Sequence, residues 1–83
     1  MAAVTQEFVD DVMRRSNYIK ETKFDKCAVV TMRLPNGFVL VESSGCVDPA
    51  NYDEEYGWKL CMERLEGRVW ELYGFALQEE GAR

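Results

Sequence analysis

The sequence predicts one small α+β domain in which a helix, an antiparallel β-hairpin and a long second helix follow one another. Three observations predict this class. Apolar residues recur at helical spacing in residues 5–16, alternate along residues 27–43, and return to helical spacing from residue 48 onward. Because the chain has only 83 residues, it has room for one hydrophobic core, so we take residues 1–83 as a single domain.

The first predicted helix spans residues 5–16. Thr5 is a suitable N-cap, because its hydroxyl can accept a hydrogen bond from a backbone amide of the first turn. Four apolar residues form one stripe and four charged residues lie opposite, which indicates a helix on the surface of the domain. The stripe consists of Phe8, Val9, Val12 and Met13, and the charged residues are Asp10, Asp11, Arg14 and Arg15.

Residues 17–25 show no clean hydrophobic period. We expect a loop here, anchored in the core by Tyr18, Ile19 and Phe24. A short strand is the alternative.

The predicted hairpin turns at residues 34–37, which read Leu-Pro-Asn-Gly. This sequence suits a type I turn, in which Pro35 fixes φ and Gly37 takes the left-handed conformation. In the resulting register the alternate apolar residues of strands 27–34 and 38–43 share one face. That face consists of Ala28, Val30, Met32, Leu34, Phe38 and Leu40.

The second predicted helix begins near residue 48. Asp48 followed by Pro49 is a typical helix start, and Asn51 offers a second start three residues later, with glutamate at the matching capping position. We expect the helix to end at Gly74, followed by an extended tail. The face predicted to cover the hairpin consists of Trp58, Cys61, Met62, Leu65, Val69 and Leu72, and the tail residues expected to pack are Phe75 and Leu77.

The second helix also carries the candidate binding residues. Asp53, Glu54 and Glu55 lie in its first turns, where the helix dipole favours negative charge. The acidic turns are therefore one predicted contact surface.

A second predicted surface lies on the side of this helix that faces away from the hairpin. Tyr56, Leu60 and Trp70 project there, and three large apolar residues exposed together on so small a domain indicate a contact site. We therefore expect a homo-oligomer. The alternative is a core wrapped more fully by the first helix and the C-terminal segment.

The composition argues against several classes of protein. The chain has no histidine, which removes the commonest general base and the commonest metal ligand, so we expect no enzyme, no metal site and no cofactor. One catalytic alternative has Cys46 as a nucleophile near the start of the long helix, with Asp48 or a lysine as base. Three cysteines without a CxxC pair indicate free thiols in a cytoplasmic protein. The sequence has no apolar run of membrane-spanning length, so we expect no membrane partner.

Charge is distributed unevenly along the chain. The net charge of −5 disfavours direct binding to nucleic acid. Residues 14–33 nevertheless hold six basic residues against two acidic ones, whereas residues 48–83 hold nine acidic residues and four basic ones. A solvated face explains the basic segment most simply. The functional alternative is sequestration of a small anionic ligand such as a nucleotide by Arg14, Lys20, Lys23 and Lys26.

Several short motifs, taken as a set, resemble a known family. They are the Asn-Gly-Phe turn at residues 36–38, the Cys-Val-Asp-Pro-Ala-Asn-Tyr segment at 46–52, and the Trp-Glu-Leu-Tyr-Gly-Phe segment at 70–75. Over roughly residues 24–80 the chain resembles the small bacteriophage proteins named after phage N-four gene forty-nine and phage Sf-six gene sixty-six. Relatives often carry proline in place of Glu71, which leaves Trp70 as an alternative helix end.

This resemblance implies an accessory protein of a phage or prophage that acts in the bacterial cytoplasm. It implies no catalytic residue. We therefore expect a non-enzymatic binding module that engages a host or defence protein through the acidic turns or through the surface around Trp70.

Overall fold

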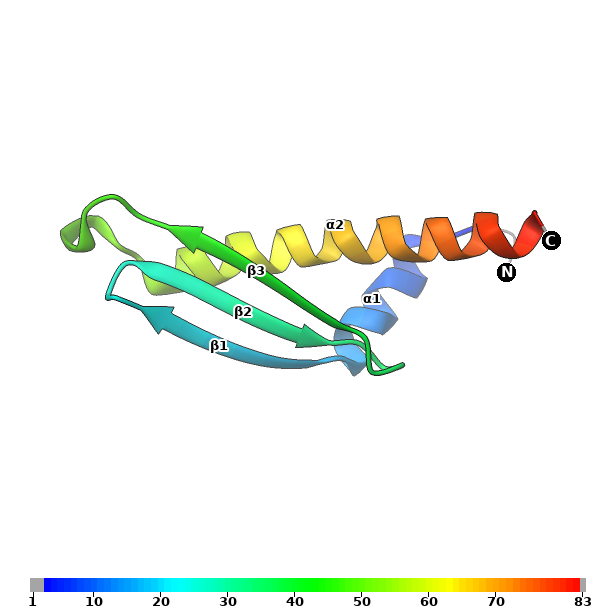
Figure 1. The fold of residues 1–83 in the computed structure, drawn as a ribbon, viewed down its shortest axis with the longest axis horizontal. Coiled ribbons are helices and arrows are strands. Elements are labelled where there is room, and N and C mark those ends of the chain that lie inside the picture. Colours follow the sequence, from blue (N-terminus) through cyan, green and yellow to red (C-terminus); the bar gives the residue numbers. More distant parts are fainter. Residues whose placement is uncertain (1–2, 83) are drawn as a thin grey trace.

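The computed structural model describes residues 3–82. A three-stranded antiparallel sheet in the order β1-β2-β3 lies against one long helix, and a short helix closes one end (Figure 1). The α+β class is confirmed. In chain order the elements are α1 (Gln6–Arg15), β1 (Asn17–Lys23), β2 (Cys27–Arg33), β3 (Val39–Gly45), the 3₁₀ helix η1 (Pro49–Asn51) and α2 (Glu54–Gly81).

Helix α1 forms as the sequence predicts. The Thr5 hydroxyl oxygen accepts a hydrogen bond from the backbone N–H of Phe8 at 3.1 Å, which caps the first turn. The helix ends at Ser16, whose hydroxyl donates to the carbonyl of Val12 at 2.7 Å. Val9 and Val12 are buried, so the predicted apolar stripe faces the core.

The expected loop at residues 17–25 is wrong, and the alternative of a strand is correct. Residues Asn17–Lys23 form β1, which pairs antiparallel with β2 along its whole length. Phe24 and Asp25, both with positive φ, then form the turn into β2. Ile19 and Phe24 do not anchor the core: their side chains are 61% and 91% exposed. Tyr18 is partly buried, and its hydroxyl donates to the carbonyl of Met13 at 2.6 Å.

The hairpin of β2 and β3 is confirmed. Gly37 has a φ of +93° and donates to the carbonyl of Leu34 at 2.9 Å, as a left-handed turn position requires. Strand β3 begins at Val39 rather than at Phe38, and the side chain of Phe38 is 53% exposed because it lies at the turn, beyond the fully covered part of the sheet. The other predicted inner residues are all buried: Ala28, Val30, Met32, Leu34 and Leu40.

Both predicted ends of the long helix need correction. The start at Asp48 gives only η1, and α2 begins at Glu54 with Asp53, not Asn51, as its N-cap. The helix also passes through Gly74 and ends at Gly81, so the expected extended tail is helical. No proline interrupts this segment, and Ala76, Leu77 and the run Gln78-Glu79-Glu80 favour helix strongly enough to continue it past one glycine.

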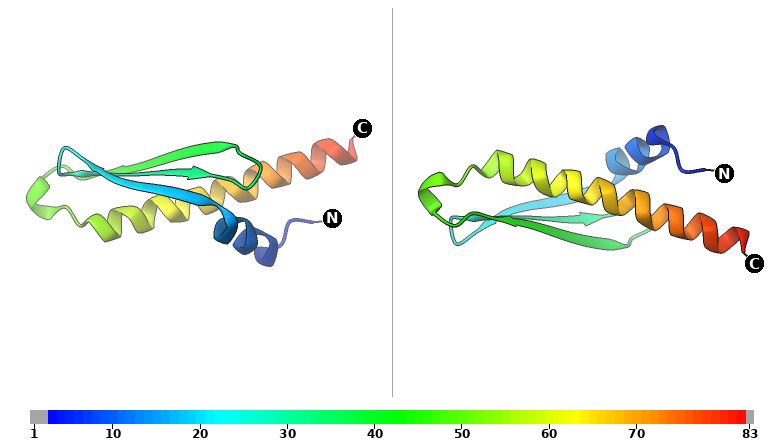
Figure 2. Two further views of the ribbon diagram at one scale, coloured as in Figure 1. Left: turned by 90° about the horizontal axis from the view of Figure 1, so that it is seen from below. Right: turned by 90° about the horizontal axis from the view of Figure 1, so that it is seen from above.

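Helix α2 packs on the inner face of β2 and β3. The predicted covering face is confirmed, with Cys61, Leu65 and Val69 fully buried and the flanking Trp58, Met62 and Leu72 packed partly against the core. The 28 residues of α2 span about 42 Å. Their C-terminal part therefore extends well past the sheet (Figure 2), and the molecule measures 51 × 20 × 19 Å.

Candidate binding surface at the start of α2

A shallow cavity of about 210 Å³ lies where the end of β3 meets the first turns of α2. It contains three of the predicted binding residues, Asp53, Tyr56 and Leu60. The full lining is Ser44, Gly45, Cys46, Asn51, Tyr52, Asp53, Tyr56, Gly57 and Leu60. We call this lining, together with Glu54 and Glu55, the acidic surface.

Local hydrogen bonds fix the backbone around this cavity. The Asp48 carboxylate accepts from the N–H of Ala50 at 2.9 Å and starts η1. The Asp53 carboxylate accepts from the N–H of Tyr56 at 3.1 Å and starts α2. Two successive helix caps therefore hold the segment between β3 and α2 in one shape.

Side chains tie the same segment to β1. The hydroxyl of Thr22 donates to the Glu54 carboxylate at 2.9 Å. It lies 2.9 Å from the hydroxyl of Tyr52, which is then the donor of that second bond. Strand β1, which the sequence predicts only as the alternative to a loop, thus positions one wall of the cavity.

The carboxylates of the acidic surface have no cationic partner in the described part of the chain. The ion pairs found among residues 3–82 join Arg14 and Arg15 to Asp11, Lys23 to Glu21, and Arg68 to Glu42. None of them involves residues 53–55. The start of α2 therefore places three carboxylates, which have no ion-pair partner within residues 3–82, beside a largely apolar cavity.

The structure does not bring Trp70 to this surface. Trp70 is partly buried and packs against the core, ten residues and about 15 Å along the helix from Leu60. The reason is α1, which lies against this part of α2: the rings of Phe8 and Tyr73 meet edge to face with centroids 4.9 Å apart. The predicted cluster of three exposed apolar residues is therefore wrong, while Tyr56 remains 59% exposed.

Two exposed apolar residues near this end of the molecule were not predicted. Val47 is 95% exposed in the segment after β3, and Phe24 is the turn residue noted above. The N–H of Cys46 donates to the carbonyl of Lys26 at 2.8 Å, so both loops lie at the same tip, seen at the left of Figure 1. Phe24 lies there because β1 pairs with β2, and no local sequence pattern predicts this position.

The basic residues of 14–33 are not gathered into one site. Arg14 pairs with Asp11 at 2.8 Å in α1, and Lys23 pairs with Glu21 at 3.0 Å at the far end of β1. A strand of seven residues separates these groups by about 20 Å. Lys20 lies by itself over the ring of Trp58, 6.0 Å from its centroid.

The cysteines occupy ordinary structural positions. Cys46 donates its thiol to the carbonyl of Asp48 at 3.3 Å, and α2 begins only at Glu54, so the thiol is not at the first turn of that helix. Cys61 is fully buried, and this burial raises the pKa of its thiol. Among residues 3–82, no group of three potential ligands could hold a metal ion. No helix in the same range is long and apolar enough to cross a membrane.

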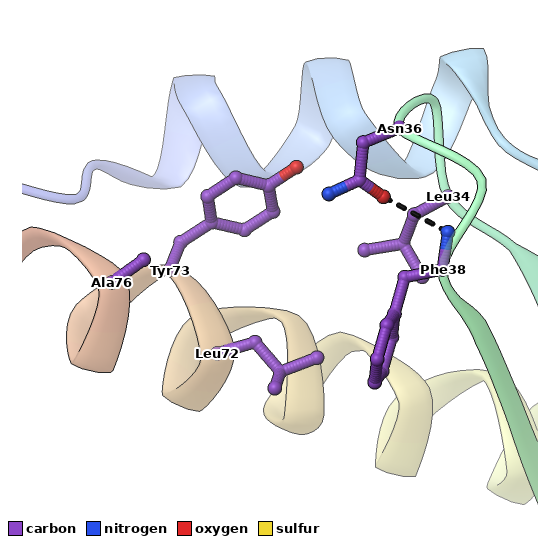
Figure 3. A pocket seen from close by; sticks show the side chains of 6 residues that line it. All are labelled: Leu34, Asn36, Phe38, Leu72, Tyr73 and Ala76. Atoms are coloured by element: carbon purple, nitrogen blue, oxygen red, sulfur yellow. Dashed lines mark hydrogen bonds between the residues drawn. The ribbon is translucent and has the colours of Figure 1, made fainter.

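A second cavity lies at the other end of the sheet. It encloses about 170 Å³ between the β2–β3 turn and the second half of α2, and Phe38 and Leu72 point toward one another across it (Figure 3). Asn36 accepts from the N–H of Phe38 at 3.0 Å and holds the turn. The remaining lining residues are Leu34, Tyr73 and Ala76, so this cavity is almost entirely apolar.

Comparison with known proteins identifies the family. The structure defines a small α+β protein with a three-stranded sheet, one long helix and a capped segment between β3 and α2. The model of the Phage protein (N4 Gp49/phage Sf6 gene 66) family matches residues 4–80, and the chain belongs to this family. The match confirms the resemblance and extends it to α1. No curated protein and no solved structure matches the chain.

Proposed function

We propose that this phage protein is a non-enzymatic accessory protein that binds a host or defence protein in the bacterial cytoplasm through the acidic surface. The observation that carries the proposal is the apolar cavity at Tyr56 and Leu60, set among carboxylates without cationic partners. The partner chemistry that fits is a basic segment carrying one apolar or aromatic side chain. Its lysines or arginines would pair with residues 53–55, and the apolar side chain would enter the cavity.

The dimensions favour a protein partner over a small ligand. Small-molecule pockets usually enclose about 300 to 1,000 Å³. The cavity of about 210 Å³ is smaller than that range and comparable to the volume of one large side chain. Exposed Phe24, Val47 and Tyr56 near the same tip supply the large apolar contacts on which protein interfaces depend.

The alternative of an anionic ligand has weaker support. The four basic residues expected to form its site do not share a cavity. Arg14 lines a hollow on α1 together with Glu7, Asp10 and Asp11, whose charges oppose an anion. Lys20 lines a separate cavity with Trp58, Lys59 and Met62. That cavity of about 350 Å³ also contains the Glu55 side chain, whose charge opposes an anion. The purification experiment described next can also detect a bound anionic ligand.

The test compares two variants of equal charge in affinity purification from a bacterial host. Glu54→Gln combined with Glu55→Gln neutralises the start of α2, and Glu79→Gln combined with Glu80→Gln neutralises the same number of charges at its other end. We expect one host protein to co-purify with the wild type and with the second variant, and at least about tenfold less of it with the first. Raising the salt concentration should release it.

Two results would contradict the proposal. Equal recovery with both variants would remove the acidic surface as the site. A nucleotide in the small-molecule fraction, retained by both variants and lost in Lys20→Gln, would support the anionic ligand instead.

A further inference from the structure

The two edges of the sheet can be compared from the hydrogen-bond register. The N–H of Leu34 donates to the carbonyl of Phe38 at 2.8 Å, so the even-numbered residues of β2 and β3 exchange hydrogen bonds with each other. The odd-numbered residues of β2 therefore face β1. It follows that the outward main-chain groups belong to the odd-numbered residues of β3, with Val41 and Ser43 at its centre, and to the even-numbered residues of β1.

The β3 edge is closed by α2. Arg64 donates to the carbonyl of Ser43 at 2.6 Å, and Arg68 donates to the carbonyl of Val41 at 3.3 Å. Arg68 also pairs with the Glu42 carboxylate at 3.2 Å. Two cationic side chains thus occupy the two central acceptors that another strand would need.

The β1 edge is open. Its outward groups are the main-chain N–H and C=O of Tyr18, Lys20 and Thr22. Among residues 3–82, no other strand and no side-chain hydrogen bond reaches these groups. Helix α2 lies over β2 and β3, which leaves β1 as the peripheral strand. A regular strand of seven residues with one unpaired edge is a template for another strand.

The geometry points to a second copy of this chain as the partner, with its β1 paired antiparallel to β1 about a two-fold axis at Ile19. The two sheets then join into one. Each position of the two-fold axis along β1 gives a different register, and the residue on the axis lies opposite its own copy. A charged residue on the axis would therefore oppose a like charge, which disfavours that register. An axis at Lys20 would oppose two ammonium groups, and an axis at Glu21 would oppose two carboxylates.

An axis at Ile19 avoids both conflicts. It places the two Ile19 side chains against each other, Asn17 opposite Glu21, and Tyr18 opposite Lys20. Tyr18 and Lys20 carry outward main-chain groups, so each such pair exchanges both of its N–H···O bonds. Axes nearer either end of β1 leave fewer residues to pair. The apolar row formed by Ile19, Thr31 and Val41 on the outer face then continues across the axis.

The surface area of the chain leaves room for a partner. The accessible surface is 5795 Å². This exceeds by about 700 Å² the roughly 5,100 Å² expected for a compact monomer of this mass. The C-terminal part of α2, which extends past the sheet, supplies part of this excess. A standard interface buries about 800 Å² on each partner, so the chain has enough accessible surface for an interface of ordinary size.

The first experiment measures mass by light scattering over a range of concentrations. We expect twice the chain mass of 9.6 kDa for the wild type. Ile19→Lys places two ammonium groups at the axis and should raise the dimer dissociation constant by about tenfold or more. Val41→Lys is the matched control, since it introduces the same charge at a similarly exposed position of the same face on β3, and it should remain dimeric. Circular dichroism checks that both variants are folded.

The second experiment tests the register in a folded dimer. Residues opposite each other in a non-hydrogen-bonded antiparallel pair have Cα atoms about 4.5 Å apart, within the range that a disulfide spans. Under mild oxidation Ile19→Cys should therefore give a covalent dimer, whereas Glu21→Cys and the wild type, with its three native cysteines, should not.

A mass of 9.6 kDa at every concentration would overturn the inference. So would a dimer that survives Ile19→Lys and dissociates in Val41→Lys, which would mean packing through the outer face, or the absence of the Ile19→Cys cross-link. None of these variants changes the acidic surface, so the outcome is independent of the proposed host contact.

Discussion

The two faces of the sheet are built from similar residues and lie in opposite environments. On the inner face, Ala28, Val30 and Met32 of β2 are fully buried beneath α2. On the outer face, Ile19 of β1 and Val41 of β3 keep 61% and 52% of their surface exposed. Because alternate residues of a strand point to opposite faces, the same strands supply both environments. The comparison teaches that α2, rather than the strands, decides which face carries the stability of the fold.

The largest expected loss of stability comes from truncating a side chain that is buried against the inner face. Leu65→Ala removes a fully buried side chain of α2 and should lower the free energy of unfolding by about 2 to 5 kcal/mol. Val41→Ala on the outer face should change it by less than about 1 kcal/mol, since its side chain is half exposed. Urea unfolding followed by circular dichroism measures both. Equal losses would mean that the outer face is buried in solution.

Two glycines of α2 provide a sharper comparison. A Cβ added at Gly57 would lie 2.7 Å from the Cβ of Ala28, so Gly57→Ala forces α2 away from the inner face. That strain costs about 1 to 3 kcal/mol and outweighs the helix propensity that alanine adds. At Gly67 an added Cβ meets no atom within 4 Å, so Gly67→Ala should stabilise by about 0.5 to 1 kcal/mol.

Thermal unfolding of these two variants should therefore shift in opposite directions. A stabilised Gly57→Ala would show that α2 does not approach β2 this closely.

The smallest expected effect is a dependence of stability on pH, which arises from the Cys61 thiol buried against the inner face. Burial raises the pKa of the Cys61 thiol above its ordinary value of 9.0, so the folded chain holds this proton more tightly than the unfolded chain. Stability from this group is complete below pH 9.0 and falls as pH rises above it, until the folded thiol also ionises. Burial shifts the pKa of Tyr18 in the same direction, from an ordinary 10.0, and adds to the loss at higher pH.

Denaturant unfolding from about pH 8 to about pH 10 measures this slope. Cys61→Ala should flatten it. Cys27→Ala should retain most of it, because burial, the largest cause of the raised pKa of Cys61, is unchanged and the charge of Cys27 is a lesser cause. If the slope of the unfolding free energy against pH is unchanged in Cys61→Ala, the pH dependence arises from other groups.

Half of the acidic surface was predictable because it depends on local chemistry. The helix dipole places Asp53, Glu54 and Glu55 near a helix start, whereas capping preferences predict Asp48 or Asn51 as the cap and only the structure shows that Asp53 caps α2. The burial of Trp70 could not be predicted from the sequence. Trp70 lies on the side of α2 that faces away from the sheet, and that side is buried only where another element packs against it. Here α1 lies against that part of α2, and the contact joins residues some sixty-five positions apart, such as Phe8 and Tyr73.

The sequence by itself determined α1, the turn at residues 34–37, the inner face of the hairpin and the covering stripe of α2, since caps, turn residues and hydrophobic periods act between near neighbours. Only the tertiary structure decided that residues 17–23 form a strand. Tyr18, Lys20 and Thr22 lie on the inner face of β1, beyond the main cover of α2, so no apolar alternation marks them and their pairing with β2 makes the strand. The same long-range pairing placed Phe24 at the tip and left one edge of the sheet open, because a strand edge exists only once its neighbours are in place.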